Sequence, residues 1–516
     1  MLNKLEYVRG CLRQGRYTEA RSQAVRITEI SPDVIEGWIF LARADASLSD
    51  YPKALVSIQK ALSLDGNHPT ALLVSIEASL GCGLVAEALA TAARLERERK
   101  NDPSVVLQVG YCFTRTNRHA DAARCYERVR ILQPANNIVL HNLAGAYLAL
   151  GEAERAEQLY TELLHKEPSA CEAYYNRATV RKQTPDNNHV AELEHLLAGL
   201  KSGDWGEAPI CYALAKELED IGEWDRSFAA LTRGAASLHR QTRYEIAADL
   251  AQMDAVKKLF DKTFCNAQEP GHLGERPIFI VGMPRTGTTL VDRILSSHSQ
   301  VGSIGESDEF HRALLRQAPA GSGRIDVARL HSIAWDKVGV EFCRAAAGLE
   351  PSRPVRLDKT LTNFLYAGAI LKALPGARVI HVRRHPMDAC YAIYKTLFRA
   401  GLSYSYDLGD LGRYYLGYKA MMEHWQEMPP GRIFTVDYEE LVENQEQVSR
   451  AMVSFCGLDW EEACLSFEKN ASPSFTASAV QVRSPVYSSS VRLWRRYEAG
   501  LAPLRRILED GGCAVD

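Results

Sequence analysis

Five alanines recur every 34 residues, and this repeat limits what the first third of the chain can fold into. They are Ala20, Ala54, Ala88, Ala122 and Ala156. Five positions before them stand small or turn-forming residues: Gly15, Ser49, Gly83, Asn117 and Gly151. Twelve positions after three of the alanines stand prolines, namely Pro32, Pro134 and Pro168. The pattern predicts units of two helices joined by a tight turn, with a proline that ends the second helix.

A single helix pair of this size cannot bury its apolar face, so neighbouring pairs are expected to stack into a solenoid. The period and pattern resemble the tetratricopeptide repeat over about residues 1–170. Residues 171–260 are interpreted as further, degenerate helical pairs. The concave face of a solenoid either docks a partner or only packs and spaces the chain, and the sequence leaves both open.

The composition excludes several classes of protein. The 516 residues carry 61 Lys and Arg against 64 Asp and Glu, a balance that argues against a dedicated nucleic-acid binder. No apolar run has the length of a membrane helix, and the N-terminal residues have no apolar signal core. The twelve cysteines form no Cys-x-x-Cys. We therefore expect a cytoplasmic protein with reduced thiols and no membrane span.

The second half of the chain begins with a pattern typical of an anion site. The run Ile278–Val281 predicts a buried strand, and a helical pattern starts after Thr289. Between them lies a loop that starts at Gly282. A strand, a tight turn and a helix N-terminus direct backbone N–H groups and the helix dipole at one point.

The spacing of Gly282 and Gly287 is that of the nucleotide-triphosphate P-loop, but Thr288 replaces its lysine. Without that lysine, ATP or GTP hydrolysis is disfavoured. Arg285 inside the loop and three nearby threonine hydroxyls favour a smaller anion such as a phosphosulfate. An ordinary tight turn between strand and helix is the alternative.

Two further strands are predicted, each followed by polar residues. The strand at 377–383 leads into Arg384, and the strand at 432–436 leads into Tyr438. Ligands of open α/β sheets bind at the carboxyl ends of parallel strands, and paired arginines suit a phosphate there. Tyr438 is interpreted either as a stacking partner for a base or as a core residue.

These three segments, in this order, resemble the sulfotransferase family over about residues 275–500. Together with the solenoid they are similar to bacterial tetratricopeptide-repeat sulfotransferases, whose catalytic motifs resemble those of protein-tyrosine sulfotransferases. The resemblance implies an all-α solenoid over 1–265 and a P-loop-like α/β domain with a central parallel sheet over 275–516. It implies 3′-phosphoadenosine 5′-phosphosulfate as the donor. The expected donor-binding residues are Arg285, Thr286, Gly287, Thr288, Thr289, Arg384, Tyr438, Arg483, Tyr487 and Arg492.

The resemblance also implies the catalytic residues. Glu306 is the expected base, and Lys359 is expected to neutralise charge on the bridging oxygen. Ser478 is expected to assist the leaving group. No cluster in the sequence has metal-ligand spacing, and sulfuryl transfer requires no metal.

Two positions depart from the family pattern on the side of the donor's 3′-phosphate. A serine expected after Arg384 is Ala392, and a basic residue expected before Trp494 is Leu493. We hypothesise that binding of this phosphate is weaker than in the family, or that Arg383 or Arg492 binds it instead. Ser307, Asp308 and Glu309 follow the expected base, so an acidic peptide acceptor is disfavoured there.

The sequence therefore predicts a sulfotransferase acting on a hydroxyl of a protein, a peptide or a small molecule, with peptidyl tyrosine or another phenol as a candidate. The repeats are expected to dock the acceptor, a partner protein or another copy of the chain. Two alternatives stay open. One is a scaffold that binds nucleotide and has lost most of its turnover, and the other is a small-molecule kinase.

Overall fold

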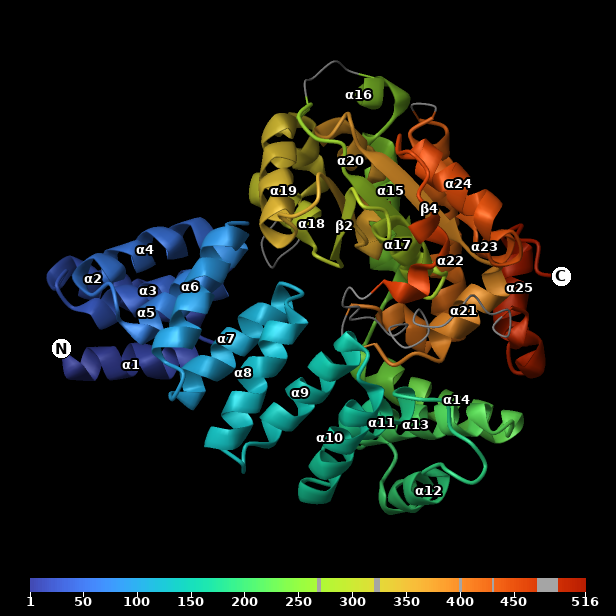
Figure 1. Ribbon diagram of the computed structural model, residues 1–516, viewed down its shortest axis with the longest axis horizontal. Coiled ribbons are helices and arrows are strands. Elements are labelled where there is room, and N and C mark those ends of the chain that lie inside the picture. Colours follow the sequence, from blue (N-terminus) through green and yellow to red (C-terminus); the bar gives the residue numbers. More distant parts are fainter. Residues whose placement is uncertain (267–270, 320–324, 399–400, 429–430, 471–490) are drawn as a thin grey trace. The chain divides into compact units, whose positions relative to one another are not determined.

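The computed structural model describes the chain except for residues 267–270, 320–324, 399–400, 429–430 and 471–490. It contains two compact units (Figure 1). The repeat unit comprises residues 1–139 and 308–351, and the sheet unit comprises residues 140–307 and 352–516. Among the helices of the described segments, none combines the length and apolarity that a bilayer crossing requires.

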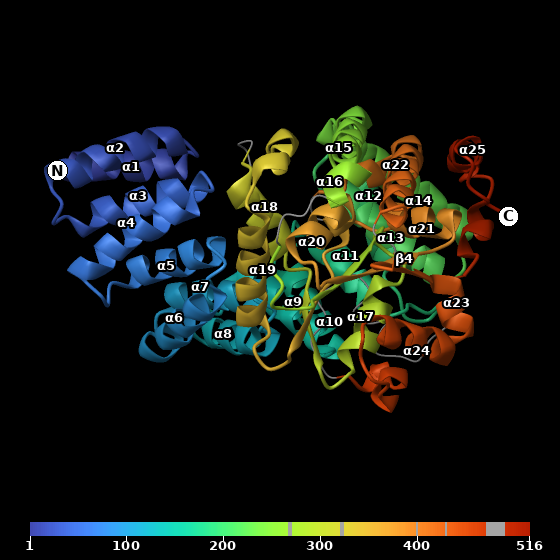
Figure 2. The ribbon, with the colours of Figure 1, turned by 90° about the horizontal axis from the view of Figure 1, so that it is seen from above.

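The repeat unit begins with four antiparallel helix pairs (Figure 2). Their helices are α1 (Leu2–Arg13), α2 (Tyr17–Ile30), α3 (Ile35–Ser47), α4 (Tyr51–Leu64), α5 (Pro69–Gly81), α6 (Val85–Glu98), α7 (Pro103–Arg115) and α8 (His119–Leu132). The periodic alanines all lie on second helices and are fully buried. The predicted helical repeat is thereby confirmed.

The turns of the repeats explain the small residues that precede the alanines. Gly15, Ser49, Gly83, Asn117 and Gly151 all have φ between 58° and 85°. This left-handed conformation suits glycine and is tolerated by asparagine. The helices α2 and α8 each end two residues before the proline that the pattern identified.

A segment from the C-terminal half completes the repeat unit. It contains α18 (Glu309–Gln317), a 3₁₀ helix at Val327–Ser332, and α19 (Trp335–Leu349), which packs on α6. A side chain at Gly348 would approach Val85 to 2.9 Å, so glycine permits this contact. Arg316 pairs with Glu341 at 2.6 Å and donates to the Gly81 carbonyl at 3.1 Å. Nothing in the sequence pattern indicated this association.

The sheet unit is built on five parallel strands in the order β2-β3-β1-β4-β5. They are β1 (Ile278–Gly282), β2 (Val301–Gly305), β3 (Val355–Asp358), β4 (Arg378–Arg383) and β5 (Ile433–Asp437). The predicted strands correspond to β1, β4 and β5, and the predicted central parallel sheet is confirmed. Because the strands are parallel, all their carboxyl ends meet at one edge.

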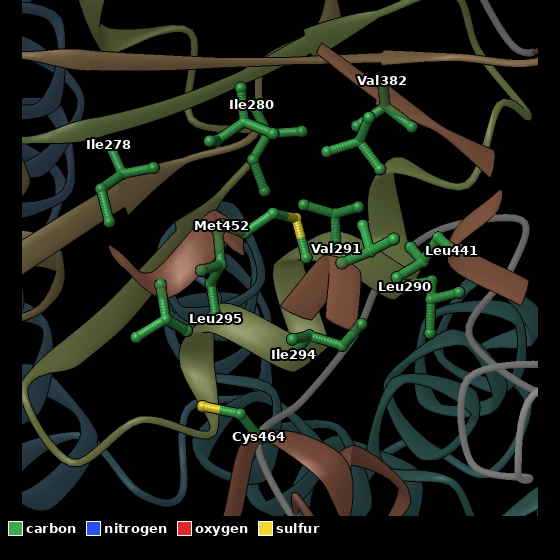
Figure 3. Packing of buried hydrophobic residues seen from close by; sticks show 14 of the residues in the cluster. Ile278, Ile280, Leu290, Val291, Ile294, Leu295, Val382, Leu441, Met452 and Cys464 are labelled. Atoms are coloured by element: carbon green, nitrogen blue, oxygen red, sulfur yellow. The ribbon is translucent and has the colours of Figure 1, made fainter. Parts of the chain in front are cut away.

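One face of the sheet packs on α17 (Thr288–Ser296), α23 (Tyr438–Glu443) and α24 (Gln445–Phe455). Ile278 and Ile280 of β1 point toward Val291 and Leu295 of α17, as Figure 3 shows. Successive side chains of β1 point to opposite faces of the sheet, and all are buried. Those on this face contact the apolar residues of α17, which fixes the orientation of the helix. The loop between them is therefore held on both sides.

The other face of the sheet is covered by α22 (Leu408–Gln426), which packs on α15 (Ile246–Leu259) and α25 (Ala502–Asp510). The remaining α-helices of the unit are α9 (Asn137–Leu150), which begins in the repeat unit, α10 (Ala153–Lys166), α11 (Cys171–Thr179), α12 (Val190–Gly199), α13 (Glu207–Asp220), α14 (Trp224–Thr242), α16 (Lys262–Asn266), α20 (Ala367–Ala373) and α21 (Pro386–Tyr394). Short 3₁₀ helices lie at Leu361–Tyr366, Ser403–Tyr406, Glu462–Leu465, Phe467–Lys469 and Leu493–Tyr497.

The degenerate helical pairs belong to the same compact unit as the sheet. Glu219 of α13 accepts hydrogen bonds from Lys395 at 2.5 Å, Tyr391 at 2.6 Å and Tyr497 at 3.0 Å. The Tyr175 hydroxyl of α11 accepts the Leu397 N–H at 3.1 Å. These contacts cross the expected division at 265–275, and that domain boundary stays a prediction.

Candidate active site at the carboxyl edge of the sheet

The polar segments singled out from the sequence lie at the carboxyl edge of the sheet. The connection after β1 leads to β2 on one side, and the connection after β4 leads to β5 on the other. The two strands that flank this reversal, β1 and β4, are neighbours. The site that the loop after β1 and Arg384 after β4 define is thus at the switch point where open α/β sheets bind ligands.

The loop after β1 is folded as an anion cradle. A side chain at Gly282 would come within 2.5 Å of the Val382 carbonyl, which explains the glycine. Arg285 and Gly287 have φ of 65° and 99°, and Thr286 Oγ1 donates to the Met283 carbonyl at 2.8 Å. The chain then enters α17 at Thr288. A tight turn that leads into a helix N-terminus is a geometry in which proteins commonly bind anions, and an anion site at this loop stays a prediction.

Residues from three strands meet at this loop. Arg384 Nη1 donates to the Arg285 carbonyl at 3.1 Å, and its guanidinium lies 4.9 Å from the centre of the Tyr438 ring. Tyr438 packs on Gly287, where a side chain would approach the ring to 2.4 Å. Tyr438 is buried in the core that includes α17. Tyr438 thus packs in the core, and its role as a stacking partner for a base stays a prediction.

Arg383 and Arg492, the alternative ligands considered for the 3′-phosphate, differ in the partners that they already have. Arg383 forms a two-pronged ion pair with Asp437, with Nη2 at 2.9 Å from Oδ2. Arg492 has an exposed side chain, and its backbone N–H donates to Asp388 at 2.6 Å. Burial and, to a smaller extent, the Arg492 charge lower the pKa of His385. Arg492 thus lies close to His385 and Asp388, whereas Arg383 is occupied by its carboxylate partner.

Two of the three expected catalytic side chains, Glu306 and Lys359, are in direct contact. Lys359 Nζ lies 2.5 Å from Glu306 Oε1. The Lys359 side chain is 3% exposed and that of Glu306 is 47% exposed. The Lys359 N–H also donates to the Gly305 carbonyl at 2.9 Å, which extends the pairing of β2 with β3. The ends of these two strands therefore hold the pair together.

Buried carboxylates support this pair. Asp358 accepts from Ser307 Oγ at 2.9 Å and from the Thr360 N–H at 2.7 Å, which links the ends of β2 and β3. Asp292 of α17 was not identified from the sequence. Burial raises the pKa of Asp292. The Lys359 charge and a hydrogen bond with Ser303 oppose this rise. An aspartate within the apolar stripe that follows the loop is the signal that could have identified it.

Three of the predicted site residues, Ser478, Arg483 and Tyr487, lie outside the described residues. Glu309, one of the acidic residues that follow Glu306 in the sequence, belongs to the repeat unit, where it is buried and pairs with Arg312 at 2.5 Å. Among the residues that the structure describes, no group of three or more His, Cys, Asp or Glu side chains is arranged to hold a metal ion.

The repeat unit has a groove of about 580 Å³ between successive second helices. Its charged lining residues are Glu96, Arg97, Lys100, Arg124 and Arg128. Arg124 pairs with Glu96 at 2.7 Å, and Arg128 donates to the Lys100 carbonyl at 3.1 Å. The groove therefore carries a net positive charge. Arg124 and Arg128 use part of their hydrogen-bonding capacity to hold adjacent repeats together.

The sheet, the loop and the edge residues define a P-loop-like α/β domain, and comparison with known proteins shows what this domain is similar to. Residues 277–462 match the model of the sulfotransferase family. An uncharacterized protein of Aquifex aeolicus (strain VF5) is 30% identical over 80% of this chain and 56% of its own length. Protein-tyrosine sulfotransferase 2 of Gallus gallus is 27% identical over 37% of this chain and 54% of its own length.

The chain spans about half the length of the curated relatives that it matches. Among solved structures, the sulfotransferase domain of the Synechococcus PCC 7002 olefin synthase is 18% identical over 48% of this chain and 99% of that domain, with a TM-score of 0.33. By the family model, residues 277–462 are similar to the sulfotransferase family, and helical repeats precede them in the chain.

Proposed function

We propose that the chain transfers a sulfuryl group from 3′-phosphoadenosine 5′-phosphosulfate to the hydroxyl of an acceptor. The observation that carries the proposal is the contact of Glu306 with Lys359 at the same sheet edge as the anion loop. A base beside a cation, close to an anion cradle, is the set of groups that in-line transfer to a hydroxyl needs.

The residues of the loop suit the phosphosulfate end of this donor. When bound, the donor supplies an activated sulfuryl group on a phosphate. The N–H groups of the loop, the N-terminus of α17 and Arg285 would hold its charge. Thr288 stands where a nucleotide-triphosphate site has its lysine, so the loop fits a γ-phosphate less well.

The pair would divide the chemistry between its members. The Glu306 carboxylate would accept the proton of the acceptor hydroxyl as that oxygen bonds to sulfur. The Lys359 ammonium would neutralise the charge that collects on the bridging oxygen as its bond to sulfur breaks. The greater exposure of Glu306 supports this assignment, because the acceptor arrives from solvent whereas the leaving oxygen stays bound.

We propose a phenolic hydroxyl, including that of peptidyl tyrosine, as the acceptor class. The similarity to a protein-tyrosine sulfotransferase over 205 residues supports this choice. The repeats would dock the acceptor or a partner protein.

The test uses the purified full chain, labelled donor and a panel of tyrosine peptides and simple phenols. We expect a labelled sulfate ester with the wild type and none with Lys359→Met. Tight binding of 3′-phosphoadenosine 5′-phosphate without product from any acceptor would favour the scaffold. Transfer from ATP instead would show a kinase.

A further inference from the structure

A buried chain of hydrogen bonds lies under the anion loop and joins it to β4, β5 and α22. His381 Nε2 lies 2.6 Å from the Tyr418 hydroxyl. The Tyr418 hydroxyl is also hydrogen-bonded to the backbone of Met283, the first residue after β1. On the other side of the imidazole, Nδ1 lies 3.5 Å from Thr435 Oγ1. None of these side chains was identified from the sequence.

The strand register explains why these groups meet. His381 pairs with Val281 of β1 and with Thr435 of β5, so the three side chains lie in a row on one face of the sheet. This face is the one opposite α17. Tyr418 of α22 reaches it with its ring 5.0 Å from that of Phe364, in an edge-to-face arrangement. Both His381 and Tyr418 are buried.

The protons of this chain can be assigned. Burial lowers the pKa of His381 to about 3, so the imidazole is neutral at pH 7. Burial raises the pKa of Tyr418, and the Met283 backbone opposes this rise, as an N–H donor does. The hydroxyl accepts from Met283, and its single hydrogen is then directed to Nε2 of His381. Nδ1 carries the remaining proton and faces Thr435.

We propose that Tyr418 and His381 are positioning residues of the donor site, an inference that rests on the proposed function. They hold the N–H of Met283 toward the buried side of the loop. Pro284 has no N–H, so the next donor along the chain is Arg285, whose carbonyl is fixed by Arg384. With both points held, the N–H groups from Arg285 to the start of α17 are set toward the ligand before it binds.

The experiment compares two tyrosines of α22. Tyr418→Phe keeps the ring and removes the hydroxyl, and it should weaken binding of 3′-phosphoadenosine 5′-phosphate about five- to tenfold, the effect of one hydrogen bond. The donor KM should rise in parallel, with the acceptor KM unchanged. Tyr414→Phe is the matched control, because its ring is likewise buried on α22 and stacks on that of Tyr404, with the ring centres 3.6 Å apart. It should change the affinity less than twofold.

A second pair of variants covers the case in which Tyr418→Phe does not fold. His381→Gln keeps an acceptor for the Tyr418 hydroxyl and should bind the nucleotide nearly as the wild type does. His381→Leu removes the acceptor and should bind it as weakly as Tyr418→Phe. Equal affinity of the wild type, Tyr418→Phe and His381→Leu would overturn the inference and leave the proposed function intact. A wild type that does not bind the nucleotide would instead contradict the proposed function.

Discussion

The contact of Glu306 with Lys359 brings together two residues that are 53 positions apart and that follow different strands. Their environments differ, since the lysine is buried and the carboxylate is half exposed. Asp292 lies within the electrostatic reach of both.

Replacement of the base tests the assignment at the first of these residues. Glu306→Gln should lower kcat at least about 10²-fold, the usual contribution of a general base. It should change the affinity for 3′-phosphoadenosine 5′-phosphate less than twofold, because the loop is untouched. Glu275→Gln, at the amino edge of the sheet, is the control and should keep full activity. Loss of nucleotide affinity equal to the loss of rate would contradict the role of Glu306 as a base.

The neighbouring arginines at the end of β4, Arg383 and Arg384, form a second matched pair. Arg384 contacts the loop and Tyr438, whereas Arg383 pairs with Asp437. Arg384→Ala should weaken nucleotide binding about tenfold or more, the value of a charge-assisted hydrogen bond. Arg383→Ala should weaken it less than threefold, and calorimetric titration measures both. The opposite order would show that the 3′-phosphate is held by Arg383.

At these positions the sequence indicates which residue types could act on a ligand, but it does not indicate which residues pack around them. The loop from Arg285 to Thr289 could be predicted because its residue types and spacing are local. The burial of Tyr438 on Gly287 depends on how β5 packs, which no local pattern contains. For the same reason the aspartate at 292 and the imidazole at 381 could not be recognised as parts of the site.

Among the elements, α13 and α21 are joined by a buried acid. Burial raises the pKa of Glu219, but the Lys395 charge and the hydrogen bonds from Tyr391 and Tyr497 outweigh this effect, and the pKa is lowered. The helices before residue 265 are thereby fixed to the helix that follows Arg384. The resemblance to a repeat gave no indication of this link, because Glu219 lies where the 34-residue register is lost.

Glu219→Gln should destabilise the chain by about 2 kcal/mol, since it leaves the Lys395 charge without its partner. The pKa of Glu219 is lower in the folded chain than its ordinary value of 4.5. Its stabilising contribution is therefore present above about pH 4.5 and is lost as the pH falls below that value. Urea unfolding at pH 7 and pH 4 measures both effects. The difference between variant and wild type should shrink at pH 4, and a constant difference would contradict the link.

Three of the five strands could be predicted from the sequence, and the other two could not. β1, β4 and β5 were predicted because their apolar runs precede polar motifs. β2 has Gly302, Ser303 and Gly305 among five residues, and β3 has only four residues. Their strand conformation comes from pairing with neighbours rather than from their own composition. Yet these two strands position Glu306 and Lys359.

At the scale of the whole molecule, each unit encloses a neutral histidine. Burial lowers the pKa of His119 in the repeat unit to about 4, and it lowers that of His381 to about 3. Both have an ordinary pKa of 6.5. The unfolded chain therefore takes up protons at these sites before the folded chain does. Stability is fully present above pH 6.5 and is lost as the pH falls toward the folded values.

We expect the free energy of unfolding to fall by about 1.4 kcal/mol per pH unit for each histidine between roughly pH 6 and pH 4. His119→Gln should make the slope shallower for the repeat unit. Denaturant titrations from pH 7.5 to pH 4.5 measure these slopes. Identical slopes in the wild type and His119→Gln would contradict the expectation.

A fragment of residues 275–516 tests the domain boundary taken from the sequence. It lacks Glu219 and Tyr175, so Lys395, Tyr391 and the Leu397 N–H lose their partners. We expect no cooperative thermal transition in near-ultraviolet circular dichroism, whereas the full chain should show one. A fragment that melts cooperatively and binds 3′-phosphoadenosine 5′-phosphate as the full chain does would support the boundary at 265–275.

Residues 308–351 belong to the repeat unit although the chain on both sides of them belongs to the sheet unit, and this limits how such a gene can have arisen. The polypeptide passes between the two units three times, at 139–140, 307–308 and 351–352. Joining a ready-made transferase gene behind a ready-made repeat gene gives one passage. The other two require an insertion between β2 and β3 that already matches the surface of α6. Swapping solenoids between such proteins by recombination at a single junction would therefore leave α19 facing a foreign helix, and functional chimeras would need paired exchanges at both places.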